Sequence, residues 1–234
     1  MTISRDGRGK ATTISASHKK AAMKLSVSIA LASALAALAA PAPLPTPTKK
    51  PQNQPGIPTE SSARAQLAGL TVAVAGSGTG YSRGLFPTWD AISGNCNARE
   101  YVLKRDGQDV QVNNACEAQS GTWISPYDNA VFTNASSLDI DHMVPLKNAW
   151  ISGASSWTTA QRKALANDVS RPQLWAVSAS SNRSKGDRSP DQWKPPLSSF
   201  YCTYAKSWID VKSFYQLTIT SAEKTALSGM LDTC

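Results

Sequence analysis

One short stretch of the chain combines residue types that can do acid–base and metal chemistry. Residues 136–146 read SSLDIDHMVPL, and His142 is the only histidine beyond the first 40 of the 234 residues. The neighbouring Asp141 offers a carboxylate, a hard oxygen ligand of the kind that Mg²⁺ prefers. A neutral imidazole near pH 7 can accept a proton from water. The pair therefore predicts a general base beside a divalent cation, with an ordinary packed Asp–His pair as the alternative.

A second oxygen ligand follows further along the chain. Residues 172–177, PQLWAV, have the apolar side chains of a short strand, and residues 178–186, SASSNRSKG, predict a helical turn that contains Asn182. Two antiparallel strands and a helix would bring the end of the first strand close to the first turn of the helix. Asp141 and Asn182 could then hold one ion together with water and substrate phosphate, which leaves His142 free as the base.

Strand alternation sets a condition on this geometry. Successive side chains of a strand point to opposite faces, so Asp141 and His142 reach one site only if the strand breaks there. Pro145 and the helix predicted after it would provide such a break. If the strand continues instead, Asp139 shares a face with Asp141, which makes Asp139 the reserve metal ligand.

The residues before the folded part have the composition of export and linker segments. Residues 23–40, MKLSVSIALASALAALAA, have a charged start, an apolar run and small residues at the end, as in a secretory signal peptide. We expect residues 1–40 to be an N-terminal extension and a signal peptide that begins at Met23. Residues 41–64 are rich in Pro, Thr and Gln and predict an extended linker or pro-segment. Residues 65–234 are then long enough for one domain with a proper core.

The basic character of the chain lies largely in this leader. The first 40 residues hold six of the 24 basic residues and one of the 16 acidic residues, so the net charge falls from +8 for the whole chain to +3 for the remainder. A weakly basic domain is compatible with binding nucleic acid but does not by itself favour it.

Four cysteines follow the leader, at positions 96, 116, 202 and 234. None forms a C-x-x-C motif, which disfavours a zinc site in a chain with so few histidines. An even number of cysteines in an exported chain favours two disulfides. Three pairings are possible, and we favour the two that join neighbours in sequence, Cys96–Cys116 and Cys202–Cys234.

The rest of the chain alternates short strand and helix patterns, so we expect an α+β fold. The predicted helices cover residues 63–70, 98–106, 145–153, 160–168, 178–186, 198–217 and 221–231. The predicted strands lie in residues 108–112, 121–133 (two strands around a turn at 126–128), 138–144 and 172–177.

Taken together, these motifs resemble the HNH endonuclease family with its ββα-metal motif. DIDHMVPL and the later RPQLWAVSASSNRSKGD are similar to the family's core, and the chain is most similar to secreted proteins related to the C-terminal domain of GmrSD-type restriction enzymes. YSRGLFPTWD, CNAREYVLKRDG, SGTWISPYD, WKPP, YCTYA and LDTC also resemble that branch, so the resemblance spans residues 65–234. It implies a ββα-metal core with additional helices and short strands, stapled by two disulfides.

The resemblance also implies roles for individual residues. Asp141 and Asn182 would bind the metal, and His142 would be the general base. Gln173 stands where the family usually has an asparagine that orients the base, so the resemblance implies this catalytic role for Gln173. Glutamine keeps the amide group, but its side chain is one methylene group longer than that of the family's asparagine.

Three basic residues follow the metal-binding asparagine. Arg183, Lys185 and Arg188 are expected to bind substrate phosphates. The alternative is a solvated turn of mixed charge, because Asp187 and Asp191 lie among them.

The function that these observations predict is that of a secreted, extracellular, monomeric endonuclease. It would hydrolyse DNA, and RNA as a second option, with Mg²⁺ or Mn²⁺ as its cofactor, and it would not contact a membrane in its mature form. The alternative is a secreted nucleic-acid-binding or effector module on a degenerate HNH scaffold without catalysis, which the departure at Gln173 and the near-neutral domain favour. An unrelated hydrolase is a third option, but the chain has no G-x-S-x-G motif.

Overall fold

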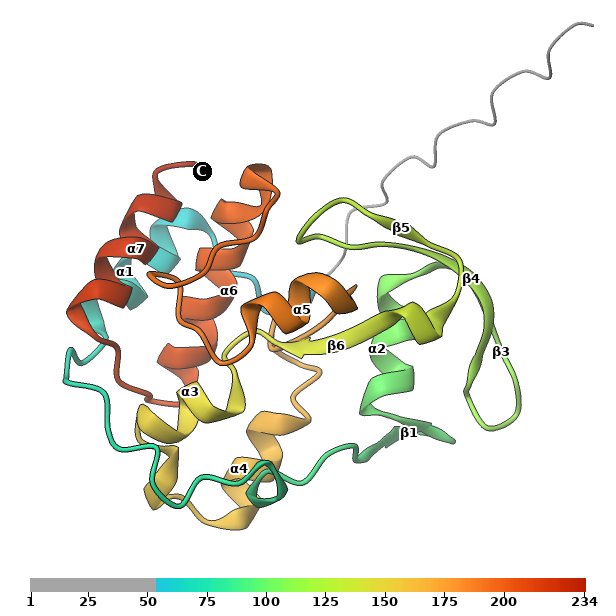
Figure 1. Ribbon diagram of the computed structural model, residues 1–234, viewed down its shortest axis with the longest axis horizontal. Helices are drawn as coiled ribbons and strands as arrows, with labels where there is room; N and C mark the ends of the chain where they lie inside the picture. The colour runs from blue at the N-terminus through green and yellow to red at the C-terminus, as the bar shows by residue number, and fades with distance from the viewer. Residues whose placement is uncertain (1–53) are drawn as a thin grey trace, which may run out of the picture. The chain divides into compact units, whose positions relative to one another are not determined.

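The computed structural model describes residues 54–234, and their regular elements confirm the predicted α+β class (Figure 1). The signal peptide and most of the predicted linker lie outside the described residues. The helices are α1 (Glu60–Gly69), α2 (Ala98–Asp106), α3 (Leu146–Ile151), α4 (Thr159–Ala166), α5 (Ala179–Lys185), α6 (Tyr201–Phe214) and α7 (Ser221–Leu231). The strands are β1 (Ala91–Ser93), β2 (Cys96–Asn97), β3 (Gln108–Val112), β4 (Ala118–Ile124), β5 (Val131–Phe132), β6 (Leu138–His142) and β7 (Leu174–Ser178).

Four short 3₁₀ turns complete the regular structure of residues 54–234: η1 (Arg83–Leu85), η2 (Ala135–Ser137), η3 (Ala154–Ser156) and η4 (Ser198–Phe200). Every helix and strand that the sequence predicts is found within a few residues, whereas β1, β2 and the 3₁₀ turns were not predicted. Within residues 54–234, no helix is both long and apolar enough to cross a bilayer.

A two-stranded antiparallel sheet and one helix lie at the centre of the fold. β6 pairs with β7, with Asp141 opposite Trp175 and His142 opposite Leu174. α5 begins directly after β7, where the side chain of Ser178 accepts a hydrogen bond from the backbone N–H of Ser181 and caps the helix. Figure 1 shows α5 lying along β6. This strand, strand and helix order is the arrangement that the sequence predicted.

The central sheet separates two hydrophobic clusters because its side chains alternate between its faces. On one face, Ile140 and Leu174 pack with α2, where Val102 is fully buried. On the other face, Trp175 and Val177 pack into the larger cluster, which α1, α6 and α7 also form. With apolar clusters against both faces, the sheet is held in place, and the end of β6 is therefore a fixed point of the fold.

The folded part begins earlier than the boundary that we predicted at Ala65. α1 starts at Glu60 and is capped by Thr59, and Ala63 is fully buried. Gln54 donates hydrogen bonds of 3.1 and 3.0 Å to the two carboxylate oxygens of the buried Asp106. The polar composition of this segment suggested a linker. A polar segment can nevertheless be part of the fold when its side chains bind buried polar groups, as Gln54 binds the carboxylate of Asp106.

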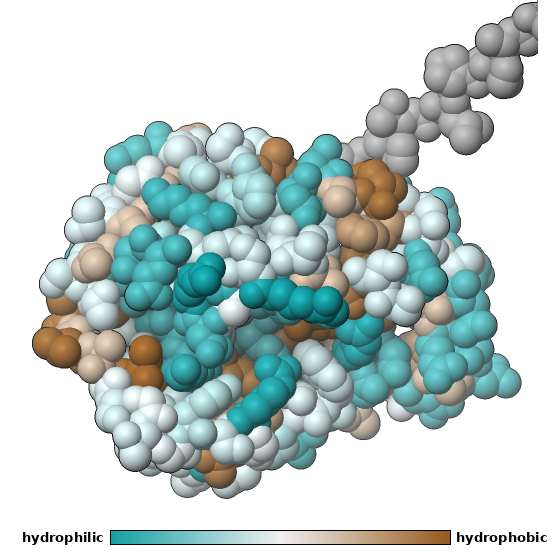
Figure 2. Space-filling model, viewed as in Figure 1, coloured by the Kyte–Doolittle hydropathy of each residue, from teal (hydrophilic) through white to brown (hydrophobic). Residues whose placement is uncertain are grey.

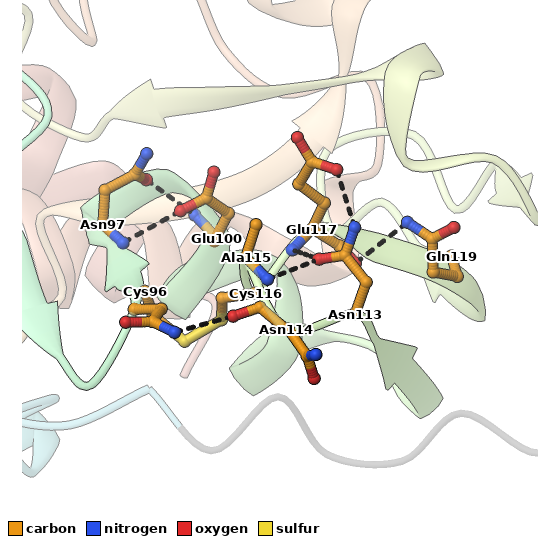
Figure 3. The surroundings of a disulfide bond; sticks show 10 residues. Cys96, Asn97, Glu100, Asn113, Asn114, Ala115, Cys116, Glu117 and Gln119 are labelled. Atoms are coloured by element: carbon orange, nitrogen blue, oxygen red, sulfur yellow. Dashed lines mark hydrogen bonds between the residues drawn. A yellow bond between two sulfur atoms is a disulfide. The ribbon is translucent and has the colours of Figure 1, made fainter.

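Both predicted disulfides are confirmed. Cys96 bonds to Cys116 and Cys202 bonds to Cys234, and no cysteine of the described chain is free. Figure 3 shows the first bond beside the start of α2, where Asn97 and Glu100 exchange hydrogen bonds of 2.9 and 3.1 Å and close a capping box. The second bond ties the start of α6 to the C-terminal residue.

Candidate active site

A polar cavity of about 220 Å³ opens where β6 ends. Figure 2 shows hydrophilic side chains around a hollow in the middle of the face that Figure 1 presents. The residues that line the cavity include Arg83, Asp141, His142, Asn182, Arg183 and Asp187. The three residues with predicted metal or base roles thus meet at one cavity, although they come from β6 and α5.

Asp141 uses one of its two oxygens to hold itself in the fold. The residue is 5% exposed, and its Oδ2 accepts hydrogen bonds from the hydroxyl of Tyr127 and, at 2.7 Å, from the ammonium of Lys185. Its Oδ1 accepts no hydrogen bond within residues 54–234. Burial raises the pKa of Asp141, and the charge of Lys185 opposes that shift. The free oxygen is therefore the one that remains for a ligand.

The hydrogen bond of His142 fixes its tautomer. Its Nε2 lies 2.9 Å from the carbonyl oxygen of Ala166. A carbonyl can only accept, so Nε2 carries the proton and Nδ1 carries the lone pair. The indole of Trp89 stacks on the imidazole, with ring centroids 5.7 Å apart and planes 12° apart. Burial lowers the pKa of His142 to about 3, against the opposing effect of the Ala166 carbonyl, so the ring is neutral at physiological pH.

Asp141 and His142 point to opposite faces of β6 but reach the same cavity because the strand ends there. The Asp141 side chain turns toward Tyr127 and the His142 ring toward Trp89, as alternation requires. The strand stops at His142, so both residues still line the cavity at its end. Gln173 holds the chain just beyond: its Oε1 accepts from the Val144 N–H at 3.0 Å, and its Nε2 donates to the Val144 carbonyl at 3.0 Å.

The orienting role expected of Gln173 therefore needs correction. Its side chain is fully buried and binds the backbone of Val144, and it makes no hydrogen bond to the ring of His142. The Ala166 carbonyl orients the imidazole instead. Gln173 acts on the site only by fixing the turn after the strand.

Asn182 is oriented by Asp139, the residue that was expected as the reserve metal ligand. Its Nδ2 donates a 3.0 Å hydrogen bond to Oδ2 of Asp139. A carboxylate can only accept, so the amide nitrogen faces Asp139 and the amide oxygen is left without a partner. Asp139 does not line the cavity. This arrangement makes Asp139 a positioning residue for Asn182 rather than a reserve ligand.

The three basic residues after Asn182 differ sharply in their environments. Lys185 is fully buried, and its ammonium contacts Asp141 and, at 2.8 Å, the carbonyl of His142. It does not reach solvent, so the expectation that it binds substrate is wrong for this arrangement. Arg188 is exposed, donates to the Ser184 carbonyl at 2.8 Å and does not line the cavity. Arg183 is exposed, lines the cavity and forms no ion pair within residues 54–234.

Comparison with known proteins identifies the family. Residues 93–230 match the family model of GmrSD restriction endonucleases, C-terminal domain. The chain belongs to this family. The resemblance predicted from the motifs is thus confirmed, and residues 54–92 precede the matched range.

A relative from Arthroderma benhamiae supports the predicted location of this GmrSD-type protein. It is 59% identical over 180 residues, which cover 77% of this chain and 88% of the relative, and it is named an uncharacterized secreted protein. Together with the two disulfides, it confirms the prediction of a secreted protein. No solved structure matches the chain.

The donor atoms of the GmrSD-type site fit a hard cation. Within residues 54–234, no group of three or more His, Cys, Asp and Glu side chains is arranged to hold a metal. The free oxygens of Asp141 and Asn182 would supply two oxygen ligands, which suits Mg²⁺ because this ion keeps several waters and relies on substrate phosphate. Lys185 offsets part of the Asp141 charge, so binding would depend strongly on the substrate.

Sequence reasoning missed several partners in this site. The Ala166 carbonyl is a backbone group, and every residue has one, so residue types cannot indicate its role. Tyr127 was noted only as part of a turn. Lys185 follows Asn182 by one helical turn, and that spacing, beside a buried carboxylate, could have indicated an inward-facing lysine. Arg83 lies in YSRGLFPTWD, a motif for which no role in the site was predicted from the sequence.

Proposed function

We propose that the protein is a secreted metal-dependent endonuclease that hydrolyses phosphodiester bonds of DNA, and of RNA as a second substrate. One observation carries the proposal. Asp141, His142 and Asn182 each use one polar atom to bond within the protein and leave the other without a partner at the same cavity. None of these three free atoms is enclosed in the protein interior, so all three are open to a ligand in the cavity.

His142 acts as the general base in this proposal. Its Nδ1 accepts a proton from a water molecule while the water oxygen forms a bond to phosphorus and the bond from phosphorus to the 3′ oxygen breaks. The 3′ oxygen takes a proton from solvent, and the product carries a 5′-phosphate. The phosphodiester brings negative charge beside the imidazole, which raises the pKa of His142 from its low value in the free protein.

Asp141 and Asn182 would hold the divalent cation through their free oxygens. A bound cation supplies positive charge that stabilises the phosphate and the departing oxygen. Arg183, which is exposed at the cavity and unpaired, binds a phosphate oxygen of the substrate. Asp139 and Gln173 position these groups without touching the substrate.

A non-catalytic binding module is the second candidate, and one observation favours it. The ammonium of Lys185 lies 2.7 Å from Asp141, where it competes with a divalent cation for the same carboxylate. If that competition prevents metal binding even with nucleic acid present, the domain binds without cleaving.

Nicking of supercoiled plasmid separates the two candidates. We expect the purified disulfide-bonded protein to convert supercoiled plasmid to open-circular and linear DNA in Mg²⁺ or Mn²⁺, and EDTA to stop the reaction. Nicked DNA should be religated by ligase without kinase treatment, because its ends carry 5′-phosphate. Binding of plasmid without any cleavage in either metal would support the binding module and contradict the endonuclease.

A further inference from the structure

The chain between α1 and β1 passes the site as a strap with little regular structure. We call residues 71–90 the N-terminal strap; its one helical element is η1. Figure 1 shows it running past α3 and α4 to β1. The strap lies before residues 93–230, which match the family model, and the resemblance of its residues 81–90 to the family assigns no role to any of them.

The first half of the strap is fixed to the body of the fold. The Ala73 N–H donates to the carbonyl of Ile219 at 2.9 Å, and the Gly76 N–H donates to the carbonyl of Ile151 at 2.8 Å. A Cβ at Gly76 would lie 3.0 Å from the Ile151 oxygen, so this close approach depends on glycine. Gly76 is therefore an anchored position of the strap.

The second half is fixed as well. Arg162 donates from Nε to the carbonyl of Leu85 at 3.0 Å. The side chain of Asn167 binds the Pro87 carbonyl at 2.8 Å and the Asp90 N–H at 2.9 Å. Hydrogen bonds therefore hold the strap on both sides of η1, which fixes the position of the turn relative to the cavity.

Between these anchors, the one charged side chain has no structural partner. Arg83 is exposed, and its guanidinium forms no ion pair or hydrogen bond within residues 54–234, yet it lines the cavity with His142 and Asn182. The anchored turn therefore holds an unpaired guanidinium beside His142, where it can bind an anion.

We propose that the N-terminal strap completes the active site and that its Arg83 is a catalytic residue that binds the scissile phosphate. This inference rests on the proposed function. A guanidinium can donate two parallel hydrogen bonds to a phosphate. Negative charge grows on the phosphate oxygens as water attacks, so a fixed cation binds the transition state more tightly than the substrate. Arg183 from α5 supplies a second such group, and Lys185 supplies none.

Three variants of Arg83 test the assignment, with Arg64→Gln as the matched control. Arg64 is a partly exposed arginine on α1, and it does not line this cavity. Arg83→Gln should lower kcat for plasmid cleavage by roughly 100-fold, the usual loss for one donor to a developing negative charge. Arg83→Lys should retain part of the activity, and millimolar guanidinium should partly restore Arg83→Ala. Arg64→Gln should cleave as the wild type does.

A binding measurement in EDTA separates this inference from the proposed function. The affinity for a short DNA duplex should depend less steeply on salt in Arg83→Gln, by about one unit in the log–log slope, because one phosphate contact is lost. If the slope changes in this way but the wild type cleaves nothing, the endonuclease proposal fails and the phosphate contact stands.

The opposite outcomes overturn the assignment. Wild-type kcat and wild-type salt slope in Arg83→Gln would show that the strap contributes no phosphate-binding group. Loss of cleavage that guanidinium does not restore, with an unchanged slope, would show that Arg83 is structural only.

Discussion

Two buried lysine–carboxylate pairs lie in this domain, and they have much in common. Lys185 pairs with Asp141 at 2.7 Å, and Lys212 pairs with Glu223 at 3.0 Å. Both lysine side chains are fully buried, and both ammonium groups lie near the ring of Trp208, at 5.8 and 5.7 Å from its centroid. Burial lowers the pKa of both lysines, and the paired carboxylate opposes the shift.

The two pairs differ in how the carboxylate oxygens are used. Both oxygens of Glu223 have partners: Oε1 accepts from the indole N–H of Trp208 at 2.5 Å, and Oε2 accepts from Lys212 at 3.3 Å. Asp141 gathers its two partners, Tyr127 and Lys185, on Oδ2 alone. The fold uses both oxygens of Glu223, whereas it leaves Oδ1 of Asp141 free for the cation that we propose. The predictions below test this comparison.

The largest effect should appear when each carboxylate is changed to its amide. Asp141→Asn and Glu223→Gln each leave a buried lysine without its counter-ion, so each should lower the free energy of unfolding by roughly 3–5 kcal/mol. Only Asp141→Asn should also lose cleavage, by more than about 100-fold per folded molecule, because even the loss of an outer partner of a metal ligand costs roughly 10–100-fold. Urea unfolding and plasmid cleavage, corrected for the folded fraction, measure both effects.

Double variants guard against failure to fold. Asp141→Asn with Lys185→Met, and Glu223→Gln with Lys212→Met, remove both charges of each pair and should cost less stability than the single changes. Full cleavage by the first double variant would contradict the comparison, as would complete loss of cleavage in a well-folded second one.

A smaller effect is the pH dependence of stability that His142, the neighbour of Asp141, should cause. The folded protein holds His142 neutral with a pKa of about 3, while the unfolded chain protonates it near its ordinary value of 6.5. The unfolded state therefore binds the proton first, and stability is lost as pH falls below 6.5. Between pH 7 and pH 5 the wild type should lose about 2 kcal/mol more of unfolding free energy than His142→Gln.

Urea titrations in EDTA at the two pH values measure this difference. The carboxylates titrate alike in both proteins, so their contribution cancels. Equal losses in the wild type and His142→Gln would mean that the imidazole is not held neutral in the fold.

The smallest effect concerns metal binding without DNA. Lys185→Met removes the cation that competes for Asp141, so Mn²⁺ should bind at least about tenfold more tightly than to the wild type. Lys212→Met removes the same charge from the other pair and should leave Mn²⁺ affinity unchanged. Titration calorimetry measures both. Equal Mn²⁺ affinity in the wild type and Lys185→Met would show that the lysine and the ion do not share the carboxylate.

Much of the fold could be predicted because its elements have local signatures. Asn97 and Thr158 precede two of the predicted helices, and each side chain caps its helix by accepting a hydrogen bond from the backbone N–H three residues later. The disulfide partners were found because both bonds join cysteines that are neighbours in sequence. By contrast, the start of the fold near Gln54 depends on a contact with Asp106, and composition does not reveal a long-range contact.

The site was predicted in part for a similar reason. Asp141, His142 and Asn182 have side chains whose chemistry is visible in the sequence, and their strand and helix context is local. The inward direction of Lys185 and the role of the Ala166 carbonyl depend on how distant segments pack. Residue type alone suggested that Lys185 faces a phosphate, whereas packing turns it toward Asp141.

Loss and chemical rescue of the base test the central claim most directly. In His142→Ala, plasmid cleavage in Mn²⁺ should fall by roughly 10²–10⁴-fold, the usual contribution of a general base, with DNA binding largely kept. Added imidazole should restore part of the rate, and the restored rate should rise with pH as imidazole loses its proton. Turnover by His142→Ala at the wild-type rate would contradict the account.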